Sequence, residues 1–412
     1  MPACGLDFGT SNSAIALPSG EVLAVEPGTP SPRLFRSVLF FPEGESETFA
    51  GAAAIARYLD DGEGRFLQSI KSHLPSAAFN ATQVRGRTMR LEDLVALLLR
   101  KLRERAESAA GVALHSVVLG RPAVFSADPK LDALAEGRLR RAAGLAGFTE
   151  VRFLIEPIAA ALAYEAQLSR DELVLVADFG AGTSDLTLMR LGPSRRGRTD
   201  RRPDVLASGG VHVGGDRFDA AIMKHKLLQY FGAKTTYRET GQRLPIPAHV
   251  VNKLLSWHEM SFIRERLTQQ LIQQMLKTSD NVPAIEALHD LVMHNLGYHL
   301  FRAIESAKVR LSSASEARVQ FHDARIHLDV RVTRAEFERF SAPLLAELSS
   351  CVDRILTTSA IAADAIEAVF LTGGSSQIPA VRRQFAERFG EEKLRTADAF
   401  TSVAEGMGRA AG

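Results

Sequence analysis

Short apolar runs alternate with longer amphipathic stretches along most of this chain. Runs such as residues 116–120 and 368–372 have the length and the aliphatic content of buried strands. Residues 91–110 instead place leucines and a valine at helical spacing on one stripe, which predicts an amphipathic helix. Because the two patterns alternate in both halves of the chain, we expect an α/β fold with mixed sheets flanked by helices.

One short pattern occurs in both halves. Residues 6–13 read Leu-Asp-Phe-Gly-Thr-Ser-Asn-Ser, and residues 177–185 read Ala-Asp-Phe-Gly-Ala-Gly-Thr-Ser-Asp. Each copy follows an apolar run and leads into an alternating one, which predicts a strand, a tight turn and a second strand. An aspartate lies near each turn, Asp7 in the first copy and Asp178 in the second. We expect two related lobes that face a central cleft.

The residue types in these turns suit phosphate binding. Glycines let backbone N–H groups approach a phosphate closely, and hydroxyl side chains add donors. Asp7 and Asp178 offer hard oxygen ligands for Mg²⁺ or its waters. We interpret the pair as a site that holds nucleotide phosphates from two sides, whereas either copy taken alone is better explained by an ordinary turn. The turn residues concerned are Gly9, Thr10, Ser11, Asn12, Gly180, Gly182 and Thr183.

The composition is typical of a globular protein with two or three domains. Of the 412 residues 46% are hydrophobic and 24% charged, and the net charge of +2 indicates neither nucleic acid nor a membrane surface as a partner. Residues 195–202 form the dense basic run, which a solvated loop explains better than a polyanion site.

The sequence predicts no membrane span and no secretion. It has no run of about 18 uncharged apolar residues, and its N-terminus enters a strand without the pattern of a signal peptide. The two cysteines, Cys4 and Cys351, fit a reducing compartment, so we expect a cytoplasmic protein.

Six segments, in order along the chain, resemble the nucleotide-binding domain of the seventy-kilodalton heat-shock chaperones, within the actin and sugar-kinase superfamily. The two turn motifs match first, although Ala181 replaces the middle one of three glycines. The segments beginning at Glu156 and at His212 resemble the family's Glu-Pro-x-Ala-Ala and Gly-Gly-Glu-Asp-Phe-Asp motifs. Residues 305–313 and 371–375 resemble its adenosine-side motifs.

The resemblance implies a fold of two actin-like, ribonuclease H-like lobes around a nucleotide cleft. Lobe I would span 1–168 with an inserted subdomain at about 35–90. Lobe II would span 169–412 with an inserted subdomain at about 220–332. The chaperones continue into a peptide-binding domain, which this sequence does not contain, so we expect a stand-alone version of the nucleotide-binding domain.

The resemblance also implies roles for individual residues. Asp7 and Asp178 would hold the hydration shell of Mg²⁺, and Asp185 would face a monovalent cation such as K⁺. Lys71 aligns with the family's catalytic lysine through its Ile-Lys-Ser context. Because this match is short, a surface lysine is the alternative. Glu156 would orient the attacking water. Glu305 and Lys308 would meet the ribose of ATP or ADP, and Ser312 the base. The remaining nucleotide contacts would come from Gly214, Gly215, Asp216, Gly373, Gly374 and Ser375.

Two departures qualify this picture. Val309 and Gln377 occupy the positions of two arginines that stack on adenine in the family, so we expect weaker nucleotide binding or looser base selectivity. Residues 219–305 form a longer stretch than in the family and carry Trp257 and an amphipathic run. This insert, within 220–305, either packs on its own lobe or binds a protein partner.

The resulting prediction is an Hsp70-like slow Mg²⁺-dependent ATPase that acts as a nucleotide-driven switch. A small-molecule kinase of the same superfamily is one alternative, although no catalytic aspartate in a substrate pocket is evident. A nucleotide-binding interaction protein without turnover is the other alternative.

Overall fold

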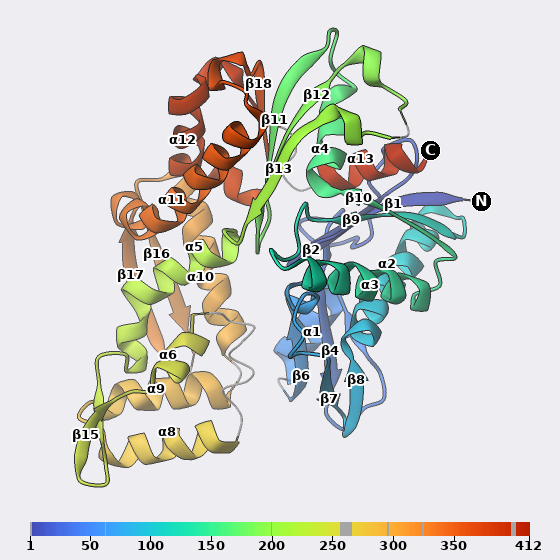
Figure 1. The fold of residues 1–412 in the computed structure, drawn as a ribbon. Helices are drawn as coiled ribbons and strands as arrows, with labels where there is room; N and C mark the ends of the chain where they lie inside the picture. Colours follow the sequence, from blue (N-terminus) through green and yellow to red (C-terminus); the bar gives the residue numbers. More distant parts are fainter. Residues whose placement is uncertain are drawn as a thin grey trace. The chain divides into compact units, whose positions relative to one another are not determined.

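The computed structural model describes residues 2–61, 63–198, 200–255, 266–294, 296–323, 325–396 and 401–412. The chain divides into two compact units (Figure 1). The first unit joins Met1–Gly214 to Glu347–Gly412, and the second comprises Gly215–Ala346. The predicted lobe boundaries are a different division of the chain and stay a prediction.

The first unit contains a five-stranded sheet in the order β10-β9-β1-β2-β3. Its central strand β1 pairs antiparallel with β2 and parallel with β9, so the sheet is mixed. The strands are β1 (Ala3–Phe8), β2 (Asn12–Ala16), β3 (Phe35–Arg36), β9 (Ser116–Arg121) and β10 (Glu150–Ile155).

A second five-stranded sheet in the same unit repeats this arrangement in the order β13-β12-β11-β18-β19. Here β11 pairs antiparallel with β12 and parallel with β18, as β1 does with β2 and β9. The repeated topology confirms the predicted fold class of two related mixed sheets flanked by helices. The strands are β11 (Glu172–Phe179), β12 (Ser184–Leu191), β13 (Val205–Val211), β18 (Ala368–Thr372) and β19 (Leu394–Thr396).

The two hairpins predicted from the repeated motif share the same register. Phe8 pairs with Ser13 in the first hairpin, and Phe179 pairs with Ser184 in the second. Four residues therefore lie between the last paired residues of each hairpin. This equivalence places Asp7 and Asp178 at the same position of two like hairpins.

Helices α4 and α13 link the two sheets within the first unit. Helix α4 contacts β9 and β10 of one sheet and β11 and β12 of the other, while α13 packs along α4 and on β1 (Figure 1). The core beneath them combines aliphatic and aromatic residues of both helices with those of β11, β12 and β18. The helices of this unit are α1 (Ala52–Asp61), α2 (Leu91–Ala110), α3 (Pro129–Leu145), α4 (Glu156–Glu165), α12 (Pro379–Phe389) and α13 (Ser402–Ala411).

Glycines allow α13 to approach its neighbours at backbone distance. A Cβ built on Gly406 would lie 1.7 Å from the carbonyl oxygen of Ala159 in α4. A Cβ on Gly408 would lie 2.3 Å from the carbonyl oxygen of Leu17. Any larger residue at these positions would push α13 away from its neighbours.

Two smaller sheets complete the first unit and lie within residues 35–90. After β3 the chain leaves the large sheet and enters a small one as β4. The break falls at the buried Ser37, whose N–H donates to the carbonyl oxygen of Ser11. The strands are β4 (Val38–Pro42), β5 (Phe49–Ala50), β6 (Gly64–Gln68), β7 (Ala81–Val84) and β8 (Arg87–Arg90).

The second unit is mostly helical and contains two separate hairpins. Buried and exposed residues alternate along the β16–β17 hairpin, and its apolar face packs on α10. The elements are α5 (Gly215–Ile222), β14 (Thr236–Glu239), β15 (Gln242–Pro245), α6 (Ala248–Lys253), α8 (Arg266–Thr278), α9 (Val282–Met293), α10 (Gly297–Ser313), β16 (Glu316–His322) and β17 (His327–Thr333). Helix α11 (Arg334–Ser359) begins in this unit and ends in the first.

No helix in the described part of the chain combines the length and the apolarity that a membrane-spanning segment needs. Cys4 and Cys351 are both free and buried.

The close crossing of α4 and α13 predicts the effect of one substitution. Gly406→Ala should lower the free energy of unfolding by about 1–3 kcal/mol, because the new methyl group overlaps the Ala159 carbonyl. Gly137→Ala in α3 is the matched control, since a Cβ there meets no atom within 4 Å. That control should raise stability by up to about 1 kcal/mol through helix propensity alone. Denaturant titration measures both, and equal stability of Gly406→Ala and wild type would contradict the packing described.

Candidate functional site

The turns of the two repeated hairpins lie close to each other. Each turn begins with a glycine that lies close to the backbone carbonyl of the fourth turn residue. A Cβ built on Gly9 would lie 2.0 Å from the carbonyl oxygen of Asn12. In the second turn the Gly180 N–H donates to the Thr183 carbonyl oxygen at 2.9 Å. A Cβ on Gly182 would lie 3.5 Å from the hydroxyl of Thr10, so the two turns face each other as the repeat predicted.

Three aspartates lie on these hairpins. Asp178 is directly opposite Asp185 across the β11–β12 pair, whereas Asp7 is opposite Ala14. Asp185 is buried and accepts hydrogen bonds from the Thr183 hydroxyl and the Ala123 N–H, both at 3.0 Å. Two like charges directly opposite in a sheet repel each other, so this arrangement requires a compensating cation or proton.

A buried ion pair lies beside the aspartates. The Lys71 ammonium nitrogen is 2.6 Å from a Glu156 carboxylate oxygen, and both side chains are only 10% exposed. Glu156 is the first residue of α4, where a carboxylate is favoured by the helix dipole and the following Pro157 suits the first turn. Lys71 follows Ser69, which is buried and has a left-handed backbone at φ 55°. Strain of this kind is often retained next to a functional group.

The protonation equilibria show that these side chains interact. Burial raises the pKa of Asp7 to about 7, and the Glu156 carboxylate adds to the effect. Burial and Glu156 likewise raise the pKa of Asp185 to about 7. The pKa of Asp178 is raised well above its ordinary value by burial, then by Glu156, Asp7 and Asp185.

Acidic side chains outnumber basic ones in this group. Four carboxylates interact with one ammonium, that of Lys71. Burial alone would lower the pKa of Lys71, but Glu156 and Asp7 raise it above its ordinary value, so the lysine stays charged. This group of side chains therefore suits a ligand that brings further positive charge.

Two glycine segments support the second turn. A Cβ on Gly214 would lie 2.3 Å from the Ala181 carbonyl oxygen, and a Cβ on Gly373 would lie 2.2 Å from that of Phe179. Gly373 also has a left-handed backbone at φ 82°, and the buried Ser375 follows it in the short helix after β18. The structure thus places Gly214 and Gly373 next to the second turn.

The remaining candidate residues form a separate cluster in the second unit. The Lys308 ammonium donates to Asp219 at 2.8 Å and to the Gly215 carbonyl oxygen at 3.2 Å. Burial, then the neighbouring carboxylate Asp219, raises the pKa of Asp216 to about 7, and burial raises that of Asp219 to about 6. Glu305 contributes to both shifts and pairs with Arg302.

Asp219 is the functional candidate that sequence reasoning missed. It belongs to the segment that begins at His212, and it follows Asp216 by one helical turn of α5 and so shares its face. One of its oxygens is buried and has no hydrogen-bond partner among the described residues.

The residues in place of the family's adenine-stacking arginines are exposed. Val309 is 62% exposed on α10, and Gln377 is exposed in the first unit. Neither residue is therefore buried in a core. Ser312 is half-buried on α10.

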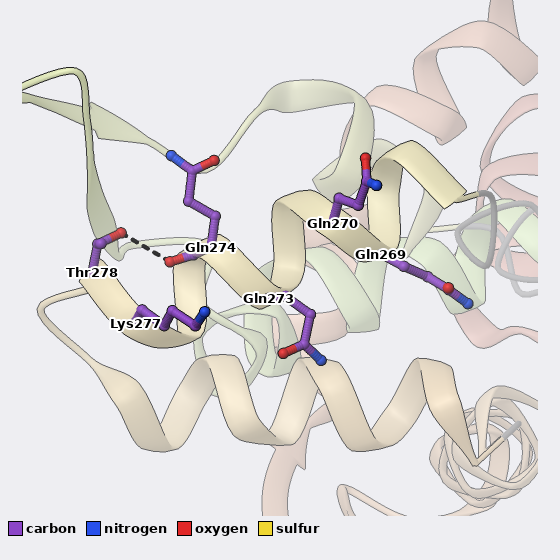
Figure 2. A pocket seen from close by; sticks show the side chains of 6 residues that line it. All are labelled: Gln269, Gln270, Gln273, Gln274, Lys277 and Thr278. Atoms are coloured by element: carbon purple, nitrogen blue, oxygen red, sulfur yellow. Dashed lines mark hydrogen bonds between the residues drawn. The ribbon is translucent and has the colours of Figure 1, made fainter.

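The insert contains a hollow of about 450 Å³ along α8 (Figure 2). It is lined by one helix alone and contains none of the residues singled out from the sequence. The apolar positions Ile272 and Met275 on α8 are buried, which supports packing within the unit, whereas Leu267 is 79% exposed. Trp257, part of the expected partner surface, lies outside the described residues. The lining residues are Gln269, Gln270, Gln273, Gln274, Lys277 and Thr278.

Within the described ranges, no three His, Cys, Asp or Glu side chains are placed to hold a metal ion by themselves. The water-mediated role expected for Asp7 and Asp178 does not require such a group.

The raised pKa values predict how stability depends on pH. For Asp7 the folded pKa of about 7 lies above the unfolded value of 3.8, so its contribution is present in acid and is lost as pH rises through 7. In metal-free, nucleotide-free buffer, Asp7→Asn should melt at a higher temperature than wild type at pH 8, and the gap should shrink towards pH 5. Asp200→Asn is the control, because Asp200 is exposed and its pKa is lowered to about 2 by Arg202. A gap that is independent of pH would contradict the assignment.

Comparisons with known proteins agree with this geometry. The sequence model of a family described as "Hsp70 protein" matches residues 64–244 and 266–412. Two relatives named "Chaperone protein DnaK", from two strains of Thermus thermophilus, are each 27% identical over 430 aligned residues. Each alignment covers all of this chain and 60% of the relative, so the chain spans about 60% of the length of these curated relatives.

The family match covers well over half of the chain and confirms the resemblance drawn from the six segments. This protein therefore belongs to the Hsp70 family of ATP-binding proteins.

Proposed function

We propose that this chain binds ATP and ADP with Mg²⁺ and hydrolyses ATP slowly, as a nucleotide-driven conformational switch. The observation that carries the proposal is the buried Lys71–Glu156 pair, 2.6 Å apart, which interacts with Asp7 and Asp178 beside two facing glycine turns. Family membership supports the nucleotide, and the arrangement of charged groups supports turnover.

The chemistry of hydrolysis accounts for these groups. Transfer of a γ-phosphoryl group to water requires an oriented water, donors to the equatorial oxygens and neutralised charge. In this proposal Glu156 accepts a hydrogen bond from the water and orients it. The charged Lys71 ammonium stabilises negative charge on the transferring group, and N–H groups of the two turns donate to the phosphates.

The residues fit a divalent cation and a monovalent cation. Asp7 and Asp178 offer carboxylate oxygens, the ligand type that Mg²⁺ prefers, and Asp185 offers one towards K⁺. The buried side-chain oxygen of Asn12, without a partner among the described residues, is a further unused acceptor. When bound, Mg²⁺ would supply positive charge that compensates the carboxylates left unpaired by the single Lys71 ammonium.

On the adenosine side, we propose that Glu305 and Lys308 contact the ribose and Ser312 the base, with Gly215 and Asp216 nearby in sequence. The Lys308 ammonium is positioned by Asp219, which supports a fixed donor at this place. We further propose a cytoplasmic location. We also propose that a protein partner binds through residues 220–305, and the exposed Leu267 supports this second proposal.

Isosteric variants of the buried pair test turnover. Lys71→Met and Glu156→Gln should each lower the ATP hydrolysis rate by about a hundredfold or more, because both groups act on the transferring phosphoryl and its water. ATP affinity, measured by calorimetry, should change little, since these interactions form mainly in the transition state. Lys101→Met, which removes an exposed lysine paired with Glu104, is the control and should hydrolyse ATP at the wild-type rate. ATP bound by all four proteins without turnover in any would favour the nucleotide-binding interaction protein.

Restoring the two arginines tests the adenine side. Val309→Arg combined with Gln377→Arg should tighten ATP binding by roughly tenfold or more through cation–π stacking. The gain should be smaller for a nucleotide with another base. Both positions are exposed, so the melting temperature should be preserved. Unchanged ATP affinity in the folded variant would show that the base is bound elsewhere.

A further inference from the structure

Arginines hold the C-terminal end of α4 by its backbone. Arg196, from the loop between β12 and β13, donates to the carbonyl oxygens of Glu165 at 2.8 Å, Ala166 at 3.2 Å and Leu168. The last carbonyl oxygens of a helix lack N–H donors within the helix, and a guanidinium at this place supplies the missing donors. The loop thereby anchors the end of the helix.

The side chain of the last α4 residue is anchored as well. Arg201 donates twice to the Glu165 carboxylate, at 2.8 and 2.9 Å, and the Gly192 N–H donates to it at 3.0 Å. Arg201 also donates to the fully buried Asp204 at 2.8 Å. We call Glu165, Arg196, Arg201 and Asp204 the arginine clasp.

The basic run at 195–202 is therefore more than the solvated loop expected from the sequence. Arg195 and Arg198 complete the network by donating to Asp204. These arginines bond to the protein itself, which also disfavours the polyanion site.

Helix stability does not explain the placement of Glu165. A carboxylate at the C-terminal end of a helix faces the negative end of the helix dipole. Replacing a buried ion pair with apolar residues is often neutral or stabilising, so such a pair is weak evidence of a stabilising role. What the clasp does provide is geometry, because several directed bonds fix where α4 ends.

The packing of α4 makes such fixation necessary. Four of its ten residues are alanines, and its contact with α13 is a backbone approach at Ala159 and Gly406. Small side chains form only shallow ridges for packing between two helices. Glu156 lies nine residues from Glu165 on the same helix, about 14 Å away at 1.5 Å per residue. A shift at one end is thus transmitted to the other.

We propose that the arginine clasp fixes α4 along its own axis and thereby holds the Glu156 carboxylate against Lys71. Arg201 is in this sense a positioning residue, and its kinetic importance rests on the proposed role of Glu156 in hydrolysis. The clasp lies at the opposite end of α4 from the turns and touches none of the residues assigned to the nucleotide.

The decisive variant removes both partners of the Glu165–Arg201 ion pair together. Glu165→Gln with Arg201→Met leaves neither a buried carboxylate at position 165 nor an unpaired guanidinium, and the new amide oxygen can still accept from the Gly192 N–H. We expect it to fold with a melting temperature close to that of wild type. In its crystal structure without nucleotide, α4 should be displaced and the Lys71–Glu156 separation should exceed hydrogen-bond length. An unchanged separation of 2.6 Å would overturn the proposal.

Kinetics supply the second readout. The double variant should lose about tenfold or more in the ATP hydrolysis rate with ATP affinity within twofold of wild type, because small misplacements of a catalytic group are costly. Arg201→Lys, which keeps the charge, should retain more of the rate than the double variant. Arg202→Met is the matched control, since Arg202 is 89% exposed and pairs only with Asp200 among the described residues. Wild-type turnover in the double variant with α4 in place would also overturn the proposal.

The two proposals fail in different ways. If wild type does not hydrolyse ATP, the proposed function fails, and the crystal structure of the double variant still decides whether the clasp positions α4. If α4 shifts without loss of turnover, the role given to Glu156 fails while the clasp stands. If the double variant does not fold, Arg196→Met, which buries no unpaired charge, is assessed by the same two measurements.

Discussion

The contact that the first unit depends on is the backbone approach of α13 to α4. Because Gly406 has no side chain, the two helices cross closely enough for both to contact the large sheets on either side. The helices deliver the groups of the site, since Glu156 begins α4 immediately after the edge strand β10. Close packing between small residues is therefore what brings Glu156 near the aspartates of both hairpins.

A second constraint is electrostatic. Folding brings together four carboxylates and one ammonium, and the raised pKa values of the aspartates measure the cost of that assembly. A protein evolved for stability alone would replace some of these groups with apolar ones. A ligand that brings positive charge would explain why these charged groups are present. Without the ligand, the Lys71 ammonium remains charged and compensates part of the negative charge.

Much of the fold could be predicted from the local pattern of apolar and polar residues. The repeated hairpins around Asp7 and Asp178 and the α2 helix follow from the spacing of apolar residues, and the structure confirms them. The hairpins β7–β8 and β14–β15 were not predicted because their strands are mostly polar and short. The turn of each hairpin contains two residues with positive φ, Arg85-Gly86 and Thr240-Gly241. The glycine in each turn is the sequence feature that could have indicated a hairpin. The pairing of Lys71 with Glu156 and the arginine clasp join residues far apart in sequence, and one sequence alone contains no information on such pairs.

The matching hairpins have a consequence in terms of symmetry. Two identical hairpins would offer the same groups to both ends of any molecule lying between them, and such a site could not distinguish one end from the other. Here the position opposite Asp178 is Asp185, whereas the position opposite Asp7 is Ala14. The carboxylate at position 185 is thus one of the differences between the two hairpins, so a repeated scaffold can impose a single orientation on what it holds.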